Sequence, residues 1–381
     1  MRILKTNRGM FMSEVYFIDT RAHVESKSKW YQPDLGAVNK LERLIEQSGA
    51  LDFIEAGDVV AIKTHFGVYG TSKPLRSVFM RKVAKMVKEK GGRPFVTETC
   101  GLGMKYDRSF AVGRIDIAEE NGYTHQTVCA PIIIADGMWG FDCVKTEIDG
   151  DQLKEVFVAK AIAEADKIIS LAHFKGHMDG GFGGAIKNLG VGCVAKRSKF
   201  DLHIDGFPKI DLKKCTGCNK CVDVCPVGAI DNEIKLDEQK CIKCNGCTEI
   251  CEPKAIRVRF NGSSETSTRI VDCAKGVLDL IGREKFYFIN FLMDITPACD
   301  CCPYSDNPIV HDIGILASKD PLAIDKSSVD LVNAAPTLPG SMAEGKEEKL
   351  GGMWNTSPKY QLDAAKKQKV GSFDYEVVRV D

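Results

Sequence analysis

The residues Cys215-Thr-Gly-Cys218-Asn-Lys-Cys221-Val-Asp-Val-Cys225-Pro226 place four cysteines at regular short spacings, and Cys241-Ile-Lys-Cys244-Asn-Gly-Cys247-Thr-Glu-Ile-Cys251 repeats that run. The first three cysteines of such a run can wrap one cube of iron and sulfide, while the fourth points away and ligates a second cube. The sequence therefore predicts two four-cysteine sites that exchange their last ligand.

This spacing is typical of bacterial-type ferredoxins with two [4Fe–4S] clusters. A pair of zinc sites is the alternative, because Cys-x-x-Cys pairs also bind zinc, but the ligand-swapped run favours iron and sulfide. The proline of the second run, Pro253, is displaced by one position, which alters the local backbone but not the ligands. The predicted clusters are held by Cys215, Cys218, Cys221 and Cys251, and by Cys241, Cys244, Cys247 and Cys225.

Composition narrows the class of protein. The 381 residues are 44% hydrophobic, and 52 basic residues balance 52 acidic ones, which argues against binding to nucleic acid or to an anionic membrane. No signal peptide and no apolar run long enough to span a bilayer is found, so we expect a cytoplasmic protein with no membrane partner. In that setting the 16 cysteines are better explained by thiols that bind metal than by disulfides.

Outside the cysteine runs, apolar strand-like segments alternate with amphipathic segments. This alternation predicts an α/β fold, with a parallel or mixed sheet and helices on both faces. We expect strands at residues 15–18, 59–62, 94–97, 132–134, 167–171, 286–291 and 312–317, and helices at residues 38–47, 75–89 with Pro74 in the first turn, 115–120, 156–165, 269–280 and 321–332.

The domain organisation follows from where this pattern stops and resumes. Residues 206–260 break it, a polar segment at 261–268 reads as a linker, and the α/β signal then returns. We therefore expect a discontinuous α/β domain of residues 1–205 and 261–381, with a ferredoxin-like α+β module inserted at 206–260. A linear string of three domains is the alternative, but the last segment has too few strands for a sheet of its own.

The densest group of chemically active residues follows the expected strand at 167–171. It runs from His173-Phe-Lys175-Gly-His177 to Gly183-Gly184-Ala-Ile-Lys187-Asn188. Ligands of α/β sheets bind at the carboxyl ends of strands, and glycines let a ligand approach the backbone closely. We predict that His173, His177 and Lys187 are catalytic and that Gly183, Gly184 and Asn188 bind a cofactor. A flexible glycine-rich loop with two solvated histidines is the alternative.

A second group, Lys63-Thr-His65, follows the expected strand at 59–62 and leads toward a helix N-terminus, which can bind an anion. We add His65 to the catalytic residues and Lys63 to the cofactor-binding ones; an ordinary loop with a surface histidine is the alternative. A third group, Glu98-Thr-Cys100-Gly101-Leu-Gly103, lacks the dinucleotide fingerprint, so a nicotinamide site is unsupported.

Three further thiols lie close together in Cys299-Asp300-Cys301-Cys302. They could bind a third metal centre, bind a substrate or pass electrons from the clusters. Adjacent cysteines cannot easily ligate one ion together, so a metal here needs a histidine from elsewhere in the chain. The alternative is that they are inert packing residues.

The order of these motifs resembles the uncharacterised Fe–S centre proteins of anaerobic archaea and bacteria, the domain-of-unknown-function family numbered 362, over residues 59–332. The matching motifs are Lys63-Thr-His65, Gly183-Gly-Ala-Ile-Lys187-Asn188, the eight-cysteine insert and Asp320-Pro-Leu-Ala-Ile-Asp325. The resemblance implies the inserted arrangement and no assigned reaction. Residues 173–187 also resemble a short stretch of the nickel-pincer lactate racemases, which implies a metal–nucleotide cofactor held by histidines and a lysine.

These observations favour an iron–sulfur oxidoreductase that exchanges electrons with a donor or acceptor protein and relays them to a small anionic substrate or cofactor in the α/β domain. One alternative is a non-redox enzyme with a metal or nucleotide cofactor, in which the clusters are structural. Another is an electron-transfer partner without catalysis.

Overall fold

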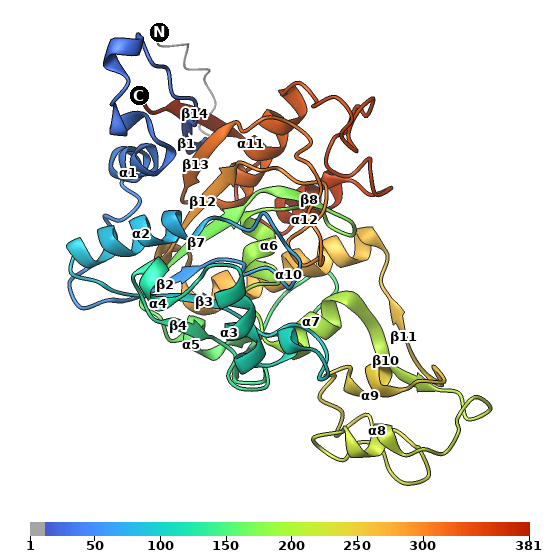
Figure 1. The fold of residues 1–381 in the computed structure, drawn as a ribbon. Coiled ribbons are helices and arrows are strands. Elements are labelled where there is room, and N and C mark those ends of the chain that lie inside the picture. Colours follow the sequence, from blue (N-terminus) through green and yellow to red (C-terminus); the bar gives the residue numbers. More distant parts are fainter. Residues whose placement is uncertain (1–11) are drawn as a thin grey trace.

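A mixed sheet of eight strands forms the centre of the molecule in the computed structural model, which describes residues 12–381 (Figure 1). The strands at one side of the sheet, β7, β2, β3 and β4, are parallel, whereas β13 runs antiparallel to both its neighbours. The predicted α/β class is therefore confirmed. In spatial order the strands are β14 (Tyr375–Arg379), β1 (Ser13–Asp19), β13 (Gly314–Ser318), β12 (Phe286–Leu292), β7 (Lys167–His173), β2 (Val59–Lys63), β3 (Arg93–Glu98) and β4 (Ile132–Ile134).

Helices cover both faces of this sheet, and each face has its own hydrophobic core. Strand β12 shows why, because Phe286 and Phe288 contribute to one core while Tyr287 and Ile289 contribute to the other. Side chains that alternate along a strand point to opposite faces, so a continuous apolar run is buried on both. One core holds α1 (Ala37–Ser48), α2 (Ser77–Glu89), α3 (Ala111–Glu120) and α4 (His125–Val128); the other holds α5 (Lys160–Ala163), α6 (Ala185–Gly190), α7 (Lys196–His203), α10 (Ser263–Ile281), α11 (Pro321–Ala334) and α12 (Pro358–Lys367).

The strands that flank residues 206–260 in sequence share this one sheet. Strand β12, which follows that segment, pairs in parallel with β7, which precedes it, from Phe286 opposite Ile168 to Phe291 opposite His173. Strand β2 pairs in parallel with the other edge of β7, from Val60 opposite Lys167 to Lys63 opposite Ser170. The carboxyl ends of β7 and β2 therefore lie next to each other, where residues from both can face one cavity.

Two predicted elements differ from the structure. Residues 156–165 were expected to be helical, but β6 (Glu155–Ala159) pairs with β5 (Cys143–Glu147) as a hairpin, and only α5 is helical. A short apolar run has no distinctive period, and here Val156 and Val158 face the core while Glu155 and Phe157 are less buried. Pro74 lies before α2 rather than in its first turn, because the backbone of Arg76 is still extended (φ −62°, ψ 135°) and the helix begins at Ser77.

The polar segment at 261–268 is also not a linker. From Ser263 it forms the first turns of α10, and Glu265 accepts a hydrogen bond from the backbone amide of Gly262 at 3.1 Å. Thr266 and Ser267 are buried despite their polarity, so tertiary contacts rather than composition decide the helix here. Neither the C-terminal helix α12 nor strand β14 was predicted from the sequence.

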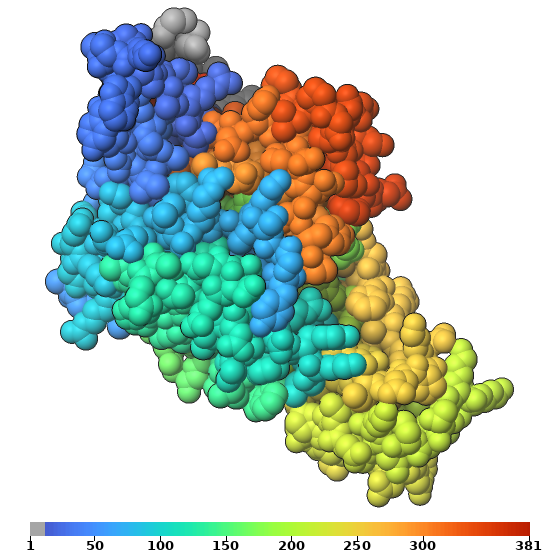
Figure 2. Space-filling view, viewed as in Figure 1, coloured from blue at the N-terminus to red at the C-terminus, as the bar shows by residue number. Residues whose placement is uncertain are grey.

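Residues 206–260 form a lobe beside the sheet, seen at the lower right of Figures 1 and 2. Its parts are the antiparallel strands β10 (Ile204–Ile210) and β11 (Ile256–Phe260) and the short helices α8 (Lys220–Asp223) and α9 (Gly246–Ile250). A small core of Cys221, Ile230, Ile234 and Ile256 fills it. Across residues 12–381, no helix has the length and apolarity needed to cross a membrane.

Candidate functional site

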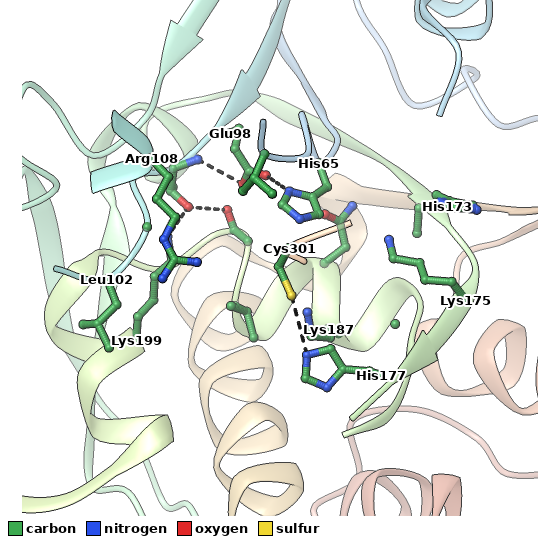
Figure 3. Close-up of a pocket in the computed structure, with 18 of the residues that line it drawn as sticks. His65, Glu98, Leu102, Arg108, His173, Lys175, His177, Lys187, Lys199 and Cys301 are labelled. Atoms are coloured by element: carbon green, nitrogen blue, oxygen red, sulfur yellow. Dashed lines mark hydrogen bonds and ion pairs between the residues drawn. The ribbon is translucent and has the colours of Figure 1, made fainter. Parts of the chain in front are cut away.

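A cavity with about 1370 Å³ of empty space, part of it open to solvent, lies at the carboxyl ends of β2, β3 and β7 (Figure 3). The hairpin of β8 (Lys175–His177) and β9 (Gly181–Gly183) and the helix α6 form another wall. All eight residues predicted for the α/β site line this cavity: Lys63, His65, His173, His177, Gly183, Gly184, Lys187 and Asn188. Two sequence segments more than a hundred residues apart therefore meet at one place.

A buried carboxylate, Glu98 at the end of β3, organises one side of the cavity. Its oxygens lie 3.0 Å from Nζ of Lys63, 2.6 Å from Nδ1 of His65 and 3.3 Å from Nη2 of Arg114 on α3. Burial alone raises the pKa of the Glu98 carboxyl, but the adjacent Lys63, His65 and Arg114 outweigh it and hold the pKa well below its ordinary value. Glu98 is therefore ionised and fixes the side chains of Lys63, His65 and Arg114.

Lys63 and Asn188 form a polar contact between β2 and α6. Nζ of fully buried Lys63 donates to Oδ1 of Asn188 at 3.0 Å, and the amide of Asn188 donates to Oγ of Ser170 at 2.8 Å. These bonds occupy most of the polar atoms of both side chains. We infer that Lys63 and Asn188, predicted to bind a cofactor, also hold the strand ends together.

His173 and Lys175 are both held by Asp300. Oδ2 of Asp300 lies 2.9 Å from Nδ1 of His173 and 3.1 Å from Nζ of Lys175, and Nε2 of His173 lies 3.1 Å from the carbonyl of Asp294. Both ring nitrogens of His173 therefore lie within hydrogen-bond distance of oxygen atoms. Burial raises the pKa of the Asp300 carboxyl, but His173 and Lys175 outweigh it and lower the pKa.

His177 faces sulfur rather than oxygen. Its Nδ1 accepts hydrogen bonds from the backbone amides of Asp179 at 3.1 Å and Gly180 at 2.9 Å, which leaves Nε2 4.0 Å from Sγ of Cys301 (Figure 3). Burial, followed by the positive charge of Lys187, holds the pKa of the His177 imidazole well below its ordinary value. The ring is therefore neutral at neutral pH.

Lys187 projects from α6 toward Cys299, whose Sγ lies 3.5 Å from Nζ. Burial lowers the pKa of the Lys187 ammonium, but Cys299 and Cys301 outweigh it and raise the pKa above its ordinary value. The start of α6 is fixed by Asp325, whose carboxylate accepts from the amides of Ala185 at 2.7 Å and Ile186 at 2.8 Å. A Cβ atom at Gly184 would lie 2.3 Å from that carboxylate, so the glycine is needed for this close approach.

Three cations of the cavity wall have no carboxylate within ion-pair distance among residues 12–381: Arg108, Lys187 and Lys199. Nζ of buried Lys199 donates to Oγ1 of Thr99 at 2.5 Å, and burial lowers the pKa of its ammonium. Arg108 is exposed at the cavity edge. Glu98 and Asp300 are each matched by cations of their own, and Asp179 is the one further acid among the described residues of the lining. Three cations against one acid leave the cavity with a surplus of positive charge, which favours an anionic ligand.

Glu98 and Asp300 are named within two of the sequence motifs but are given no role there, and four further residues of the wall were not predicted from the sequence: Arg108, Arg114, Lys199 and His203. Glu98 could have been found, since it ends β3 next to the end of β2 and a charged residue at that position faces the site. Arg114 and Lys199 have no local signal, because they lie on α3 and α7, whose placement against the sheet depends on the whole fold.

The eight cysteines of the lobe separate into two groups of four. One cavity with about 350 Å³ of empty space, including open solvent, is lined by Cys215, Cys218, Cys221 and Cys251. A second cavity of the same size, about 350 Å³, is lined by Cys225, Cys241, Cys244 and Cys247. The two groups are those expected from the ligand-swapped spacing, and apolar residues complete each lining, among them Ile210 and Ile256 in the first and Ile230 and Ile242 in the second.

The second cysteine cavity adjoins the large cavity through residues 101–105. The amide of Gly103 donates to the carbonyl of Cys244 at 3.1 Å, and Glu249 of α9 accepts from the amide of Met104 at 2.9 Å and of Lys105 at 3.2 Å. Gly101 and Leu102, at the start of the same segment, line the large cavity. This segment therefore contacts both sites.

The loop of Cys299, Cys301 and Cys302 reaches the large cavity as well. Single ligand atoms of His177, Cys299 and Cys301 all lie within 4.8 Å of one another, which is the arrangement of a candidate metal site. Cys302 is outside this group. Of the five cysteines outside this loop and the lobe, Cys100, Cys193 and Cys273 are buried, while Cys129 and Cys143 are partly buried.

Comparison with known proteins gives one strong match. The family described as "Domain of unknown function (DUF362)" matches residues 60–330. No curated protein matches the chain. Solved structures with some similarity include the lactate racemase apoprotein from Thermoanaerobacterium thermosaccharolyticum, at 11% identity and a TM-score of 0.37, covering 68% of this chain and 49% of that one. A structural-genomics protein from Thermotoga maritima is also similar, at 12% identity and a TM-score of 0.34, and the match covers 67% of this chain and 49% of that one. The chain thus spans about half the length of both.

Proposed function

We propose that this chain, which belongs to the DUF362 family, is an iron–sulfur oxidoreductase with two [4Fe–4S] clusters. In this proposal the clusters relay electrons to a small anionic molecule in the cavity at the strand ends. The observation that carries this proposal is the division of the eight cysteines between two cavities, four in each, in the swapped combination. Four sulfurs around one space are the ligand set of such a cluster.

The surroundings of the cysteines support the same assignment. The amide of Gly217 donates to Sγ of Cys215 at 3.4 Å, the amide of Ala229 to Sγ of Cys225 at 3.2 Å, and the amide of Gly246 to Sγ of Cys244 at 3.5 Å. Amide donors to cysteine sulfurs and apolar walls are the means by which a protein sets the reduction potential of a cluster. When bound, the clusters would supply electrons singly.

The route from the lobe to the large cavity supports a relay. A Cβ atom on Gly246 would lie 2.9 Å from the side chain of Met104, so Met104 packs directly on the loop that carries Cys244. Sδ of Met104 in turn lies 3.5 Å from Nζ of Lys196. Continuous packed contacts therefore link the second cysteine cavity to residues 101–105, which reach the large cavity.

The charges of the large cavity support an anionic substrate. Lys187 and Lys199 lie at its wall without a carboxylate partner among the described residues, and Arg108 lies at its edge (Figure 3). Lys187 is best placed to hold an anion beside the reacting centre, while His65, bound through Nδ1 to Glu98, can exchange a proton through its other nitrogen.

The proposal is tested on protein purified without oxygen. We expect about eight iron and eight sulfide ions per chain, and an EPR spectrum of two interacting [4Fe–4S] centres after reduction. The reduced protein is then mixed with a panel of reducible small anions, such as 2-oxo acids and oxyanions, and the loss of reduced-cluster signal is followed in wild type, Lys187→Met and the surface control Lys359→Met. Reoxidation by one anion that slows at least about ten-fold in Lys187→Met alone supports the proposal. Zinc in place of iron, or equal rates in all three proteins, would contradict it.

A further inference from the structure

The loop Cys299-Asp300-Cys301 and the hairpin residue His177 hold three soft ligand atoms together, and the two predicted clusters do not use them. These atoms, two sulfurs and one imidazole nitrogen, all lie within 4.8 Å of one another. They come from segments more than a hundred residues apart in sequence, and all three residues are largely buried. Thiolates and imidazole are the ligands that zinc and similar thiophilic cations prefer.

We propose that His177, Cys299 and Cys301 form a third metal site, which binds one thiophilic divalent cation with an open coordination position toward the large cavity. Cys301 and His177 line that cavity, whereas Cys299 lies behind them. Three protein ligands and a position left for water or substrate are the pattern of catalytic rather than structural zinc sites.

The residue between the two cysteines explains how their sulfurs come together. The side chain of Asp300 points away from them, to His173 and Lys175, and is itself almost fully buried. Oγ1 of Thr71 binds the carbonyls of Asp300 at 3.2 Å and Cys302 at 3.0 Å, which fixes the backbone on both sides of Cys301. The two ligands are therefore positioned by bonds that do not depend on the cation.

Lys187 supports the charge of the site. Its ammonium lies 3.5 Å from Sγ of Cys299, where it stabilises the thiolate form that metal binding requires. Both thiols must lose their protons to ligate a cation, and the ammonium offsets part of the resulting negative charge.

His177 is the weakest of the three ligands. Its Nδ1 accepts two backbone hydrogen bonds, so the proton of the neutral ring resides on Nε2, facing Cys301. For Nε2 to ligate a cation as part of a neutral ring, that proton must move to Nδ1, which breaks both amide hydrogen bonds. We therefore expect Cys299 and Cys301 to supply most of the affinity.

The test uses the full chain, purified without oxygen with its iron in place and dialysed against equimolar zinc. We expect about one zinc per chain in wild type and in Cys302→Ser, which changes the neighbouring thiol outside the triad. The double variant Cys299→Ser/Cys301→Ser should bind zinc at least about 100-fold more weakly, and His177→Ala about ten-fold more weakly. Unchanged iron content and circular dichroism show that each variant is folded.

X-ray absorption at the zinc edge of the wild type needs no variant and is blind to iron. We expect two sulfur ligands at about 2.3 Å and nitrogen or oxygen ligands at about 2.0–2.1 Å. A spectrum of four sulfurs would place the zinc among the eight cysteines of the lobe and overturn the proposal, as would equal zinc binding by wild type and the double variant. Either failure leaves the cluster proposal standing, because that one is decided by iron, sulfide and EPR.

Discussion

Oδ2 of Asp300 lies 2.9 Å from Nδ1 of His173, so the carboxylate between Cys299 and Cys301 is bound to the end of β7. Because Lys175 binds the same oxygen at 3.1 Å, one buried side chain connects the cysteine loop, the central sheet and the β8–β9 hairpin. His173, predicted to be catalytic, is therefore placed to position the loop as well.

We predict that Asp300→Asn weakens zinc binding by about 10–100-fold without changing the number of sulfur ligands. The neutral amide binds Lys175 and His173 less strongly, so Cys299 and Cys301 lose their fixed spacing. Competition with a chromophoric chelator measures the affinity, and Asp306→Asn, an exposed acid in the following segment, is the control. A variant with wild-type affinity would show that Asp300 does not position the ligands.

Glu98→Gln should lower the free energy of unfolding by about 3–5 kcal/mol. The carboxylate is the partner of fully buried Lys63 and of buried Arg114, and its loss leaves both charges without compensation. Urea unfolding followed by tryptophan fluorescence measures the change. Glu120→Gln, exposed at the end of α3, should change it by less than about 0.5 kcal/mol. A similar small change at Glu98 would contradict the role given to this carboxylate.

Cysteines that share a cavity should give matching spectra when they are replaced. Cys221→Ser and Cys251→Ser should alter the same EPR signal, and Cys247→Ser and Cys225→Ser the other, because each pair lines one cavity. Ligation by consecutive cysteines would instead pair Cys221 with Cys225. Anaerobic EPR of the four reduced variants distinguishes these pairings, and Cys143→Ser is a control outside the lobe.

Stability should fall in mild acid because of His203. Burial, then the charges of Lys187, Arg108 and Lys199, lowers the pKa of this imidazole from 6.5 to about 4. In the unfolded chain His203 binds a proton below pH 6.5, whereas in the folded chain it does so only below about pH 4. The folded state therefore keeps its full stability above pH 6.5 and loses part of it as the pH falls from 6.5 to about 4. The loss amounts to no more than about 3 kcal/mol, and solvent around the partly exposed ring reduces it. In His203→Gln, the fall in unfolding free energy from pH 7 to pH 5 should be smaller than in wild type; equal falls would exclude His203 as the cause.

Glu249→Gln should loosen the contact between the lobe and residues 101–105. The carboxylate accepts from two successive amides, Met104 and Lys105, and charged acceptors form stronger hydrogen bonds than neutral ones. Hydrogen–deuterium exchange should therefore rise at these two amides. Glu252→Gln, which breaks an exposed ion pair with Lys220 in the same lobe, should leave their exchange unchanged.

Much of the fold could be predicted because local pattern and final environment agree. The run at β12 is apolar throughout and is buried on both faces, and Asp320 caps α11 through the amides of Leu322 and Ala323, each at 2.9 Å, as the Asp-Pro pair predicts. The hairpin of β5 and β6 was missed because a short apolar run fits a helix or a strand equally well. Helix α10 begins in a Ser/Thr-rich segment, so its first turns depend on burial that composition does not reveal.

Like the fold, the candidate site could be predicted from the sequence only in part. Lys63, His65 and His173 could be located because they end predicted strands, and the eight cysteines because their spacing has a geometric cause. Asp300 could not, since its importance depends on a contact with His173, 127 residues away in sequence. The grouping of His177 with Cys299 and Cys301 likewise exists only after the hairpin and the loop are folded against each other.

Residues 103–105 bind Cys244 and Glu249 of the lobe. This contact shows which of the two cysteine groups lies nearer the large cavity in the proposed relay. The group of Cys225, Cys241, Cys244 and Cys247 is on the inner side of the lobe, next to the segment that reaches the large cavity, whereas the other group includes the exposed Cys218. If the proposed relay operates, we expect a redox partner to dock at the outer end of the lobe, near exposed Cys218. Because the inner end is occupied by its contact with residues 103–105, a partner bound there would leave the mouth of the large cavity free for the proposed substrate.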